Sequence, residues 1–525
     1  MGEPVLRTTP LLRGVSEAGL ATASASSARV ELPAGQYLFH AGDEATSLFV
    51  LVRGRLEVVS PDGALLRTLA PGDAVGELAF LTAAPRSADV RARRDCSVVR
   101  LPREAFLELL GTEPELLRTI VEVLARQVSQ GPARGAGAGA GVLAVVALTD
   151  DDPARLREAL PGSGWLDEAT AGADWPAAVE RLEAGTAAVL LGCAAGSSSA
   201  WRRFCVRTAD RTVVLADSAS DCAPYRSVAH GLAVRLGPGE RWPDGAGRRP
   251  VLRQRLEQDG DLAVLGRRLA GRSPGLVLSG GGARGLAHVG VLQQLEQSGW
   301  WPDRWGGTSM GAFVAALGAM GLDAAAVAEV CRQELVERRP FRDWALRPRQ
   351  GLLRAGRARA MLTRVFGTLR VEDLRHDYFC VTADLLSGDL VVHREGPLVE
   401  LVGASMSVPG VAPPVRLGGS LHVDGGVLDN LPVDVMAETG EGPVVAVDVM
   451  NRGAGLDDPK LLEVIGQALT IGGRQRVVAN LARADVVITP ALDGIGLFDF
   501  DASDRAIAAG RAAALAKVEA LPPGG

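Results

Sequence analysis

Leu276-Val-Leu-Ser-Gly280-Gly-Gly-Ala-Arg-Gly285 is the stretch that decides the fold of the C-terminal part of the chain. The apolar run 276–278 predicts a buried strand, the glycines predict a tight turn, and the run 286–297 predicts a helix. Such a turn exposes several backbone N–H groups at a helix N-terminus, which suits an anion. The glycine pattern also fits a dinucleotide-binding fold. That fold needs an acidic residue at the end of a second strand, whereas Asp303 lies in a Trp-Pro turn.

A second motif follows within the same predicted α/β unit. Gly307-Thr-Ser309-Met-Gly311 has the GxSxG pattern of a nucleophile elbow, in which a serine occupies a sharp turn between strand and helix. The apolar run 312–320 predicts a helix that is buried on all sides. Ser309 is therefore a candidate nucleophile.

The third motif is Val423-Asp424-Gly425-Gly426, at the predicted end of a strand. A serine nucleophile needs a base within hydrogen-bond reach, and histidine usually fills that role. His422 could share a strand face with Asp424 and stays a minor alternative, while Asp424 acting directly on Ser309 is the simpler interpretation. None of the six histidines follows the motifs in a recognisable Ser–Asp–His order; they are His40, His230, His288, His376, His393 and His422.

The order of these three motifs resembles the patatin-like phospholipases. That family uses a glycine-rich oxyanion loop, a GxSxG serine and an Asp-Gly aspartate as a Ser–Asp dyad without histidine. The resemblance extends from Leu276 to Val447 and includes the stretches 279–292, 407–410 and 429–433.

The resemblance implies Ser309 as the nucleophile and Asp424 as the base. Elbow glycines would be Gly307 and Gly311, and the aspartate motif would comprise Asp424, Gly425 and Gly426. Arg284 would either brace the glycine loop, meet an anionic head group or form a salt bridge within the fold. The resemblance also implies an oxyanion hole, worth about 3 kcal/mol per well-placed donor, from the loop residues Gly280, Gly281, Gly282, Ala283, Arg284 and Gly285.

The N-terminal part of the chain predicts a different fold. Short apolar segments at 36–39, 47–52, 55–60 and 65–69 are separated by glycine-containing turns, which indicates a small β-barrel or roll flanked by helices at 11–28 and 103–130.

One stretch after these segments resembles the phosphate-binding cassette of cyclic nucleotide-binding domains. There Arg86 would hold the cyclic phosphate of cAMP or cGMP and Glu77 would accept a hydrogen bond from the ribose. Many such domains are structural or bind proteins, so that alternative stays open, and Ser87 does not decide between adenine and guanine. The candidate nucleotide-binding residues are Gly76, Glu77, Leu78, Ala79, Arg86 and Ser87.

The whole chain therefore predicts a multidomain α/β protein. A cyclic nucleotide-like roll ahead of a patatin domain resembles the neuropathy target esterase group, and the stretch 201–217 resembles the region that lies between them there. Alternating strands and helices in the middle segment predict a parallel sheet. The expected parts are a cyclic nucleotide-binding-like domain (1–130), a Gly/Ala-rich linker (131–141), an intermediate α/β domain (142–273), a patatin-like domain (274–490) and a C-terminal helix and tail (491–525).

Composition excludes several other classes of protein. The net charge of −6 and the low aromatic content of 4% argue against a nucleic-acid binder. Six scattered cysteines without a CxxC pair predict free thiols and no metal site. The N-terminus lacks the pattern of a secretory signal, and the uncharged runs 184–201 and 305–322 suit buried segments better than membrane spans. We expect a cytoplasmic protein, peripheral to the inner face of the membrane.

We therefore expect a serine esterase that hydrolyses acyl esters of phospholipids or lysophospholipids, needs no cofactor, touches the membrane surface transiently and is regulated by its N-terminal domain. One alternative is a cyclic-nucleotide-responsive regulatory protein whose hydrolase domain is an interaction platform. Another is an esterase that acts on soluble esters.

Overall fold

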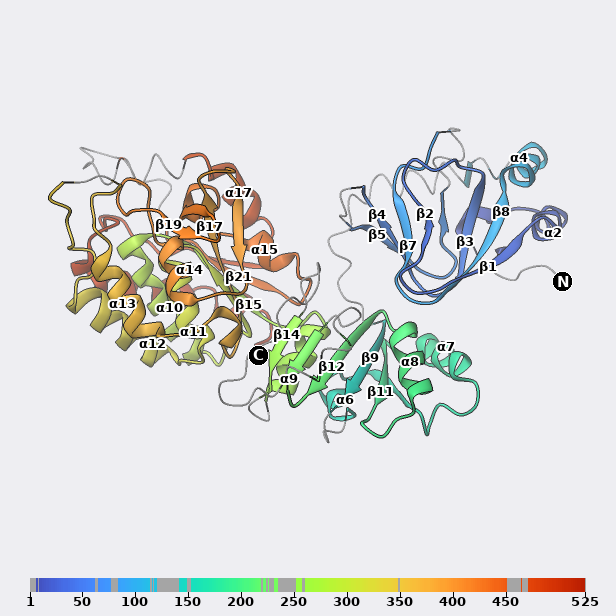
Figure 1. Cartoon of the computed structure of the whole chain (residues 1–525), viewed down its shortest axis with the longest axis horizontal. Helices are drawn as coiled ribbons and strands as arrows, with labels where there is room; N and C mark the ends of the chain where they lie inside the picture. The colour runs from blue at the N-terminus through green and yellow to red at the C-terminus, as the bar shows by residue number, and fades with distance from the viewer. Residues whose placement is uncertain are drawn as a thin grey trace. The chain divides into compact units, whose positions relative to one another are not determined.

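The computed structural model describes residues 6–7, 9–61, 65–76, 84–113, 116, 118–119, 141–148, 153–218, 221–222, 225, 231–234, 252–256, 260–347, 350–450, 464 and 471–524. Two compact units make up the chain (Figure 1). The first comprises residues 1–157, 161–215 and 227–230, and the second comprises residues 158–160, 216–226 and 231–525. The predicted linker 131–141 lies outside the described residues except for Gly141.

The first unit begins with the expected roll, built from two antiparallel four-stranded sheets. One sheet has the order β1-β8-β3-β6 and the other β2-β7-β4-β5. The first contains β1 (Ala28–Leu32), β8 (Cys96–Pro102), β3 (Ser47–Arg53) and β6 (Ala74–Val75), and the second β2 (Tyr37–Phe39), β7 (Asp89–Ala92), β4 (Leu56–Val59) and β5 (Leu65–Leu69).

Strand alternation builds two cores in the roll. Leu48 and Val50 on β3 pack with the flanking helices α2 (Glu17–Ala25) and α4 (Arg103–Thr112), whereas Leu51 packs inside the roll. The helix predicted at 11–28 is shorter than expected, because Ser16 caps α2 at its start and residue 28 already belongs to β1. The second half of the helix predicted at 103–130 lies outside the described residues.

Four strands of a six-stranded sheet follow in the first unit, in the parallel order β10-β11-β9-β12 that the alternating pattern predicts. Side-chain caps from Asp174 and Ser198 start the helices α7 and α8. The elements are β9 (Val142–Ala147), α6 (Arg155–Ala159), β10 (Ser163–Asp167), α7 (Trp175–Gly185), β11 (Ala188–Cys193), α8 (Ser199–Thr208) and β12 (Arg211–Ala216).

Buried charges join the roll to this parallel sheet within the first unit. Arg94, in the turn between β7 and β8, donates to Glu183 at 2.8 Å and lies 3.6 Å from the carboxylate of Asp210. Asp210 also accepts the backbone N–H of Val142 at 2.9 Å and lies 3.3 Å from Nε of Arg55. The roll thus shares an ion-pair network with the start and end of the neighbouring sheet.

The second unit contains a mixed eight-stranded sheet of order β19-β20-β17-β16-β15-β21-β22, with β18 paired to β17. The strands from β17 to β22 along this order run parallel, while β18 and β20 run antiparallel to β17. They are β15 (Gly275–Leu278), β16 (Arg304–Gly307), β17 (Asp377–Asp384), β18 (Leu390–His393), β19 (Val415–Leu417), β20 (Ser420–Asp424), β21 (Val444–Val447) and β22 (Val486–Ile488).

Helices cover both faces of this sheet, because successive residues of β15 point to opposite sides. Leu276 and Leu278 join the larger core and Val277 joins the other. The larger core includes α10 (Ala287–Gln297), α11 (Met310–Ala319), α12 (Ala324–Cys331), α13 (Gly356–Phe366), α14 (Leu398–Ser405) and α18 (Ser503–Leu515), and the opposite one α15 (Val433–Ala437) and α17 (Arg474–Leu481).

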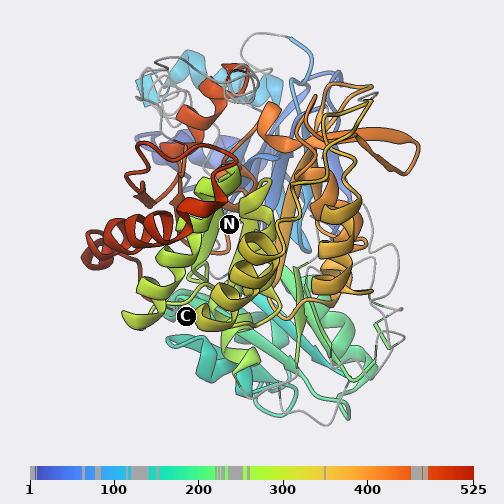
Figure 2. The ribbon, with the colours of Figure 1, turned by 90° about the vertical axis from the view of Figure 1, so that its left-hand side faces the viewer.

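The C-terminal helix α18 lies against α10 (Figure 2, red). Glycines permit this close packing, since a Cβ atom on Gly290 would lie 1.9 Å from the carbonyl oxygen of Ile507, and one on Gly510 would lie 2.0 Å from that of Ala287. Within the segment predicted as a C-terminal helix and tail (491–525), α18 ends at Leu515, and a short 3-10 turn, η8 (Val518–Ala520), follows. The C-terminal segment therefore belongs to the core of the second unit.

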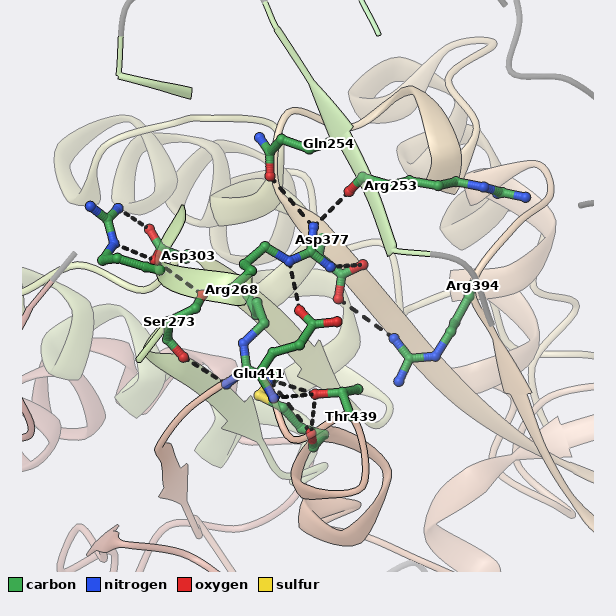
Figure 3. Close-up of polar contacts among 12 residues, drawn as sticks. Arg253, Gln254, Arg268, Ser273, Asp303, Asp377, Arg394, Thr439 and Glu441 are labelled. Atoms are coloured by element: carbon green, nitrogen blue, oxygen red, sulfur yellow. Dashed lines mark hydrogen bonds and ion pairs between the residues drawn. The ribbon is translucent and has the colours of Figure 1, made fainter. Parts of the chain in front are cut away.

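A buried ion-pair cluster lies where β15, β16, β17 and β21 begin (Figure 3). Arg268, on α9 (Asp261–Leu269), donates from Nε to Glu441 at 2.6 Å and lies 3.4 Å from Asp377. Arg304 donates to the carbonyl of Ser273 at 2.7 Å. Because α9 and four strand starts meet here, the cluster fixes the sheet at the edge opposite to the ends of β15 and β16.

Two further expectations can be compared with the fold. All six cysteines are buried free thiols, as their spacing predicts. In the part of the chain that the structure describes, no helix combines the length and the apolar character needed to cross a membrane.

Candidate active site

The turn after β16 places Ser309 in a strained conformation at the start of α11. Its backbone has φ 55° and ψ −121°, a region that residues with a side chain rarely adopt. Cβ atoms on Gly307 and Gly311 would lie 2.7 Å and 2.2 Å from the carbonyl oxygen of Leu278. Glycine is therefore required at both positions, and the predicted nucleophile elbow has the expected geometry.

Asp424, the last residue of β20, faces Ser309. The Asp424 carboxylate lies close enough to the Ser309 side chain to interact with it, and it accepts the backbone N–H of Gly426 at 2.8 Å. Burial raises the pKa of Asp424 to about 6, although both contacts favour the ionised form. Gly425 has no room for a side chain, because a Cβ would lie 2.6 Å from the carbonyl oxygen of Val381.

Some backbone N–H groups of the glycine loop 280–285 donate to carbonyl oxygens of the protein, and others have no such acceptor within the described ranges. Gly280, Ala283 and Arg284 donate to the carbonyl oxygens of Asn430, Leu497 and Gly281, respectively. Gly285 lies inside the 3-10 helix η3 (Gly282–Leu286). Among the described residues, no acceptor is found for the N–H groups of Gly281 and Gly282, and both residues line the same cavity as Ser309. Of the six loop residues predicted to form the oxyanion hole, these two are placed to donate.

Arg284 braces the loop. Its Nε donates to the carbonyl oxygen of Ile495 at 2.6 Å. This contact is the one expected of a bracing arginine, and contact with an anionic head group or a salt bridge within the fold stays a prediction.

Two buried polar residues support the site, and neither is among the residues that the sequence predicts to form it. Asn430 donates from its side-chain amide to the carbonyl oxygen of Gly280 at 3.1 Å. Ser405, the last residue of α14, accepts the backbone N–H of Ser309 at 2.9 Å and donates to the carbonyl of Val381 at 2.8 Å. Asn430 belongs to the stretch 429–433 that resembles the patatin family, but only the folded chain reveals its contact.

Histidines lie away from the serine. His422 and His393 both contact the hydroxyl of Thr382, at 2.9 Å and 2.7 Å, and burial lowers the pKa of His393 to about 4. His288 contacts the carbonyl oxygen of Ser279. Within the described ranges no histidine forms a hydrogen bond with Ser309 or Asp424; His230 lies outside them.

Ser309 and Asp424 open into a cavity of about 630 Å³. Its wall is mainly apolar, which suits an acyl chain. Arg354, Arg359, Glu400 and Arg416 supply charged groups to the same lining. The apolar wall includes Met361, Leu362, Val399, Met406, Val408 and Val411.

The predicted nucleotide site in the roll is described only in part. Glu77, Leu78 and Ala79 lie outside the described residues. The buried Arg86 donates to the carbonyl oxygens of Gly76 at 2.9 Å and Ser47 at 2.6 Å, and its guanidinium stacks 4.2 Å from the ring of Phe39. Ser87 follows it in the loop before β7. Arg86 therefore binds the roll's own backbone in this structure.

Comparison with known proteins agrees with both folds. The patatin-like phospholipase family matches residues 276–437, and the cyclic nucleotide-binding domain family matches residues 29–113. An NTE family protein of Mycobacterium tuberculosis is 33% identical, over 98% of this chain and 96% of that protein. The chain belongs to the NTE family. The carboxylic ester hydrolase expected from the sequence is thereby confirmed as the enzyme class.

Longer proteins of NTE type are more distant. Patatin-like phospholipase domain-containing protein 6 of Homo sapiens and lysophospholipase nte1 of Aspergillus niger are each 27% identical to this NTE family chain. These matches cover 83% and 84% of this chain but only 38% and 36% of the two relatives. The shared region therefore corresponds to a little over a third of those proteins.

Proposed function

We propose that this protein hydrolyses acyl esters of lysophospholipids or phospholipids, with Ser309 as nucleophile and Asp424 as base. The observation that carries the proposal is that Ser309 and Asp424 lie together at the wall of an apolar cavity, beside two available N–H groups. The name of the Aspergillus relative, a lysophospholipase, favours the same substrate class.

In the first half of the reaction, Ser309 Oγ attacks the acyl carbonyl carbon while its proton passes to the Asp424 carboxylate. The N–H groups of Gly281 and Gly282 stabilise the oxyanion of the tetrahedral intermediate. The intermediate then collapses, the bond to the leaving glycerol oxygen breaks, and that oxygen takes the proton from Asp424. An acyl ester on Ser309 remains.

In the second half, water attacks the acyl ester and gives a proton to Asp424. The Ser309 oxygen leaves and recovers that proton, which releases a fatty acid and regenerates the dyad. The apolar wall holds the acyl chain throughout. No histidine takes part in either half.

A fluorophosphonate probe tests this function, because it labels an activated serine. We expect labelling of the full chain and of the control Ser298→Ala, whose hydroxyl contacts Gln294 away from the cavity, but not of Ser309→Ala. Micellar lysophosphatidylcholine should be hydrolysed faster than a soluble short-chain ester. Absence of labelling would favour a regulatory protein whose hydrolase domain is an interaction platform. A preference for the soluble ester would favour an esterase that acts on soluble esters.

We also propose that the roll binds a cyclic nucleotide and thereby changes the rate of hydrolysis. The family match over residues 29–113 supports binding. A phosphate would have to replace the carbonyl oxygens that Arg86 now contacts. Calorimetry and kcat/KM measurements on the full chain, with and without cAMP or cGMP, test this, and Arg86→Ala should abolish any effect. No heat at millimolar nucleotide would overturn it.

A further inference from the structure

The stretch 338–359 is strongly basic in a chain whose net charge is −6. It contains eight arginines within 22 residues, and its one acidic residue is Asp343. The arginines are Arg338, Arg339, Arg342, Arg347, Arg349, Arg354, Arg357 and Arg359.

Part of this stretch forms the wall of the active-site cavity. Residues 340–347 and 350–355, named here the mouth hairpin, contribute Pro340 and Phe341 from one arm and residues 353–355 from the other to the cavity lining. Trp344 and Leu353 bridge the two arms as antiparallel partners. Both arms of the mouth hairpin therefore contribute to the wall of the cavity.

Contacts outside the hairpin hold its base in place. The ring of Phe341 stacks on that of Phe500 at 5.2 Å, and the guanidinium of Arg339 lies 2.8 Å from Asp501. The backbone N–H of Leu353 donates to the carbonyl oxygen of Val411 at 2.8 Å. The mouth hairpin is thus anchored on two sides of the cavity.

The outer part of the hairpin exposes large apolar side chains. Trp344 is 55% exposed and Leu346 is 89% exposed. A tryptophan beside a leucine at a surface suits the boundary between lipid and water, where an amphipathic ring has both an apolar and a polar neighbour. Burial of these side chains in a lipid layer would remove apolar surface from water.

Three exposed arginines occur in the same stretch of chain as this apolar pair. In the described part of the chain, no ion pair reaches Arg347, Arg354 or Arg357. Their neighbours differ, since Arg338, Arg339 and Arg359 pair with Glu334, Asp501 and Glu400. Three exposed cations and two exposed apolar side chains within one short stretch match the two components of an anionic lipid surface.

We propose that the mouth hairpin, together with Arg357, docks the enzyme on an anionic bilayer, so that Trp344 and Leu346 enter the lipid interface and the arginines contact phosphate groups. This inference rests on the proposed function, because a lipid substrate would leave that bilayer beside the cavity. The position of the mouth hairpin favours a bilayer as the partner, because the segment that would meet the bilayer continues into the cavity wall that would receive the acyl chain.

Vesicle binding by the full chain tests the proposal. We expect tighter binding to phosphatidylcholine vesicles that contain phosphatidylglycerol than to vesicles without it, with the difference decreasing as salt rises. Arg347→Gln with Arg357→Gln should weaken binding to the anionic vesicles by about fivefold per arginine. Trp344→Ser with Leu346→Ser should weaken binding to both kinds of vesicle.

Matched substitutions at other exposed positions serve as controls. Arg203→Gln on α8 and Leu515→Ser on α18 should bind vesicles like the unmodified chain. Hydrolysis of a soluble short-chain ester should stay unchanged when Trp344, Leu346, Arg347 and Arg357 are substituted as above. This measurement separates docking from catalysis. The inference would be overturned if the unmodified chain bound vesicles with and without phosphatidylglycerol equally well. It would also be overturned if the substituted chains bound vesicles as tightly as the unmodified chain. If the unmodified chain bound anionic vesicles but hydrolysed no ester, the docking inference would stand and the proposed function would be contradicted.

Discussion

The side-chain amide of Asn430 donates to the carbonyl oxygen of Gly280 at 3.1 Å, across 150 residues of sequence. The same amide group lies against the aspartate turn, since a Cβ on Gly426 would be 2.8 Å from its oxygen. Asn430 therefore connects the loop that offers oxyanion donors to the turn that holds Asp424. This buried side chain adds to the backbone hydrogen bond from the Gly280 N–H to the Asn430 carbonyl oxygen in holding the two parts together.

Asn430→Ala should lower kcat/KM about 100-fold, because a displacement of the donors by about an ångström has effects of that size. Stability should fall by only about 1–3 kcal/mol, the usual result of leaving a buried group unpaired. Steady-state kinetics and thermal unfolding measure the two effects. An unchanged kcat in a folded variant would show that Asn430 does not position the loop.

Ser309→Ala and Asp424→Asn should each remove nearly all ester hydrolysis while the chain still folds. The double substitution should be no worse than either single one, since nucleophile and base act as a unit. As controls, His422→Ala and His393→Ala should keep most of the activity, because their rings contact Thr382 instead of the dyad. A histidine substitution as damaging as Asp424→Asn would contradict the dyad.

The raised pKa of Asp424, about 6, predicts the pH dependence of the reaction. A base acts only when it is deprotonated, so activity should be complete well above pH 6 and decrease as the pH falls through that value. Below it, kcat/KM should fall about tenfold per pH unit. A pH–rate profile measured where circular dichroism shows a folded chain checks this. A constant rate between pH 7 and pH 5 would contradict it.

Backbone strain at Ser309 predicts a gain in stability on substitution. Its φ of 55° and ψ of −121° suit glycine, so Ser309→Gly should be more stable than Ser309→Ala by about 1 kcal/mol. Both variants lack the nucleophile, so the comparison isolates the backbone. Urea unfolding of the two proteins gives the difference, and equal midpoints would show that the turn is not strained.

Arg268→Met should destabilise the second unit by about 3–5 kcal/mol. The methionine fills similar space but leaves the largely buried carboxylate of Glu441 without its arginine, while Asp377 keeps its ion pair with Arg394. Arg332→Met, which removes an exposed arginine paired with Glu329, should cost less than about 1 kcal/mol. Thermal unfolding compares the two. Equal effects would mean that the buried cluster contributes no more than a surface pair.

Local patterns were sufficient to predict most of the fold and the two central residues of the site. The turn containing Ser309 is predictable because its glycines are dictated by backbone contacts within a few residues, as at Gly307 and Gly311. The strands of the roll and of the parallel sheet follow from apolar runs and glycine turns near in sequence.

Other parts of the site depend on contacts between distant segments. Which loop N–H groups remain available is decided by Asn430 and Leu497, which lie far beyond the loop in the sequence. Ser405 has no local signature, because its role depends on α14 meeting the elbow. The early end of the first predicted helix reflects strand pairing of residue 28 with Arg100, which overrides local helix preference.

Arg268 and Glu441 are separated by 173 residues, yet the buried guanidinium of Arg268 donates to the carboxylate of Glu441. During synthesis on the ribosome, Arg268 emerges long before Glu441, the carboxylate that compensates the burial of its charge. At about 5–20 residues per second, the interval is roughly 10–35 seconds. The nascent hydrolase must wait through this period with α9 undocked, whereas the strands of the roll are all complete by residue 102. During synthesis of this enzyme there is therefore a long interval in which only the N-terminal part can be folded. We expect chaperones to bind the unfolded remainder of the chain in that interval.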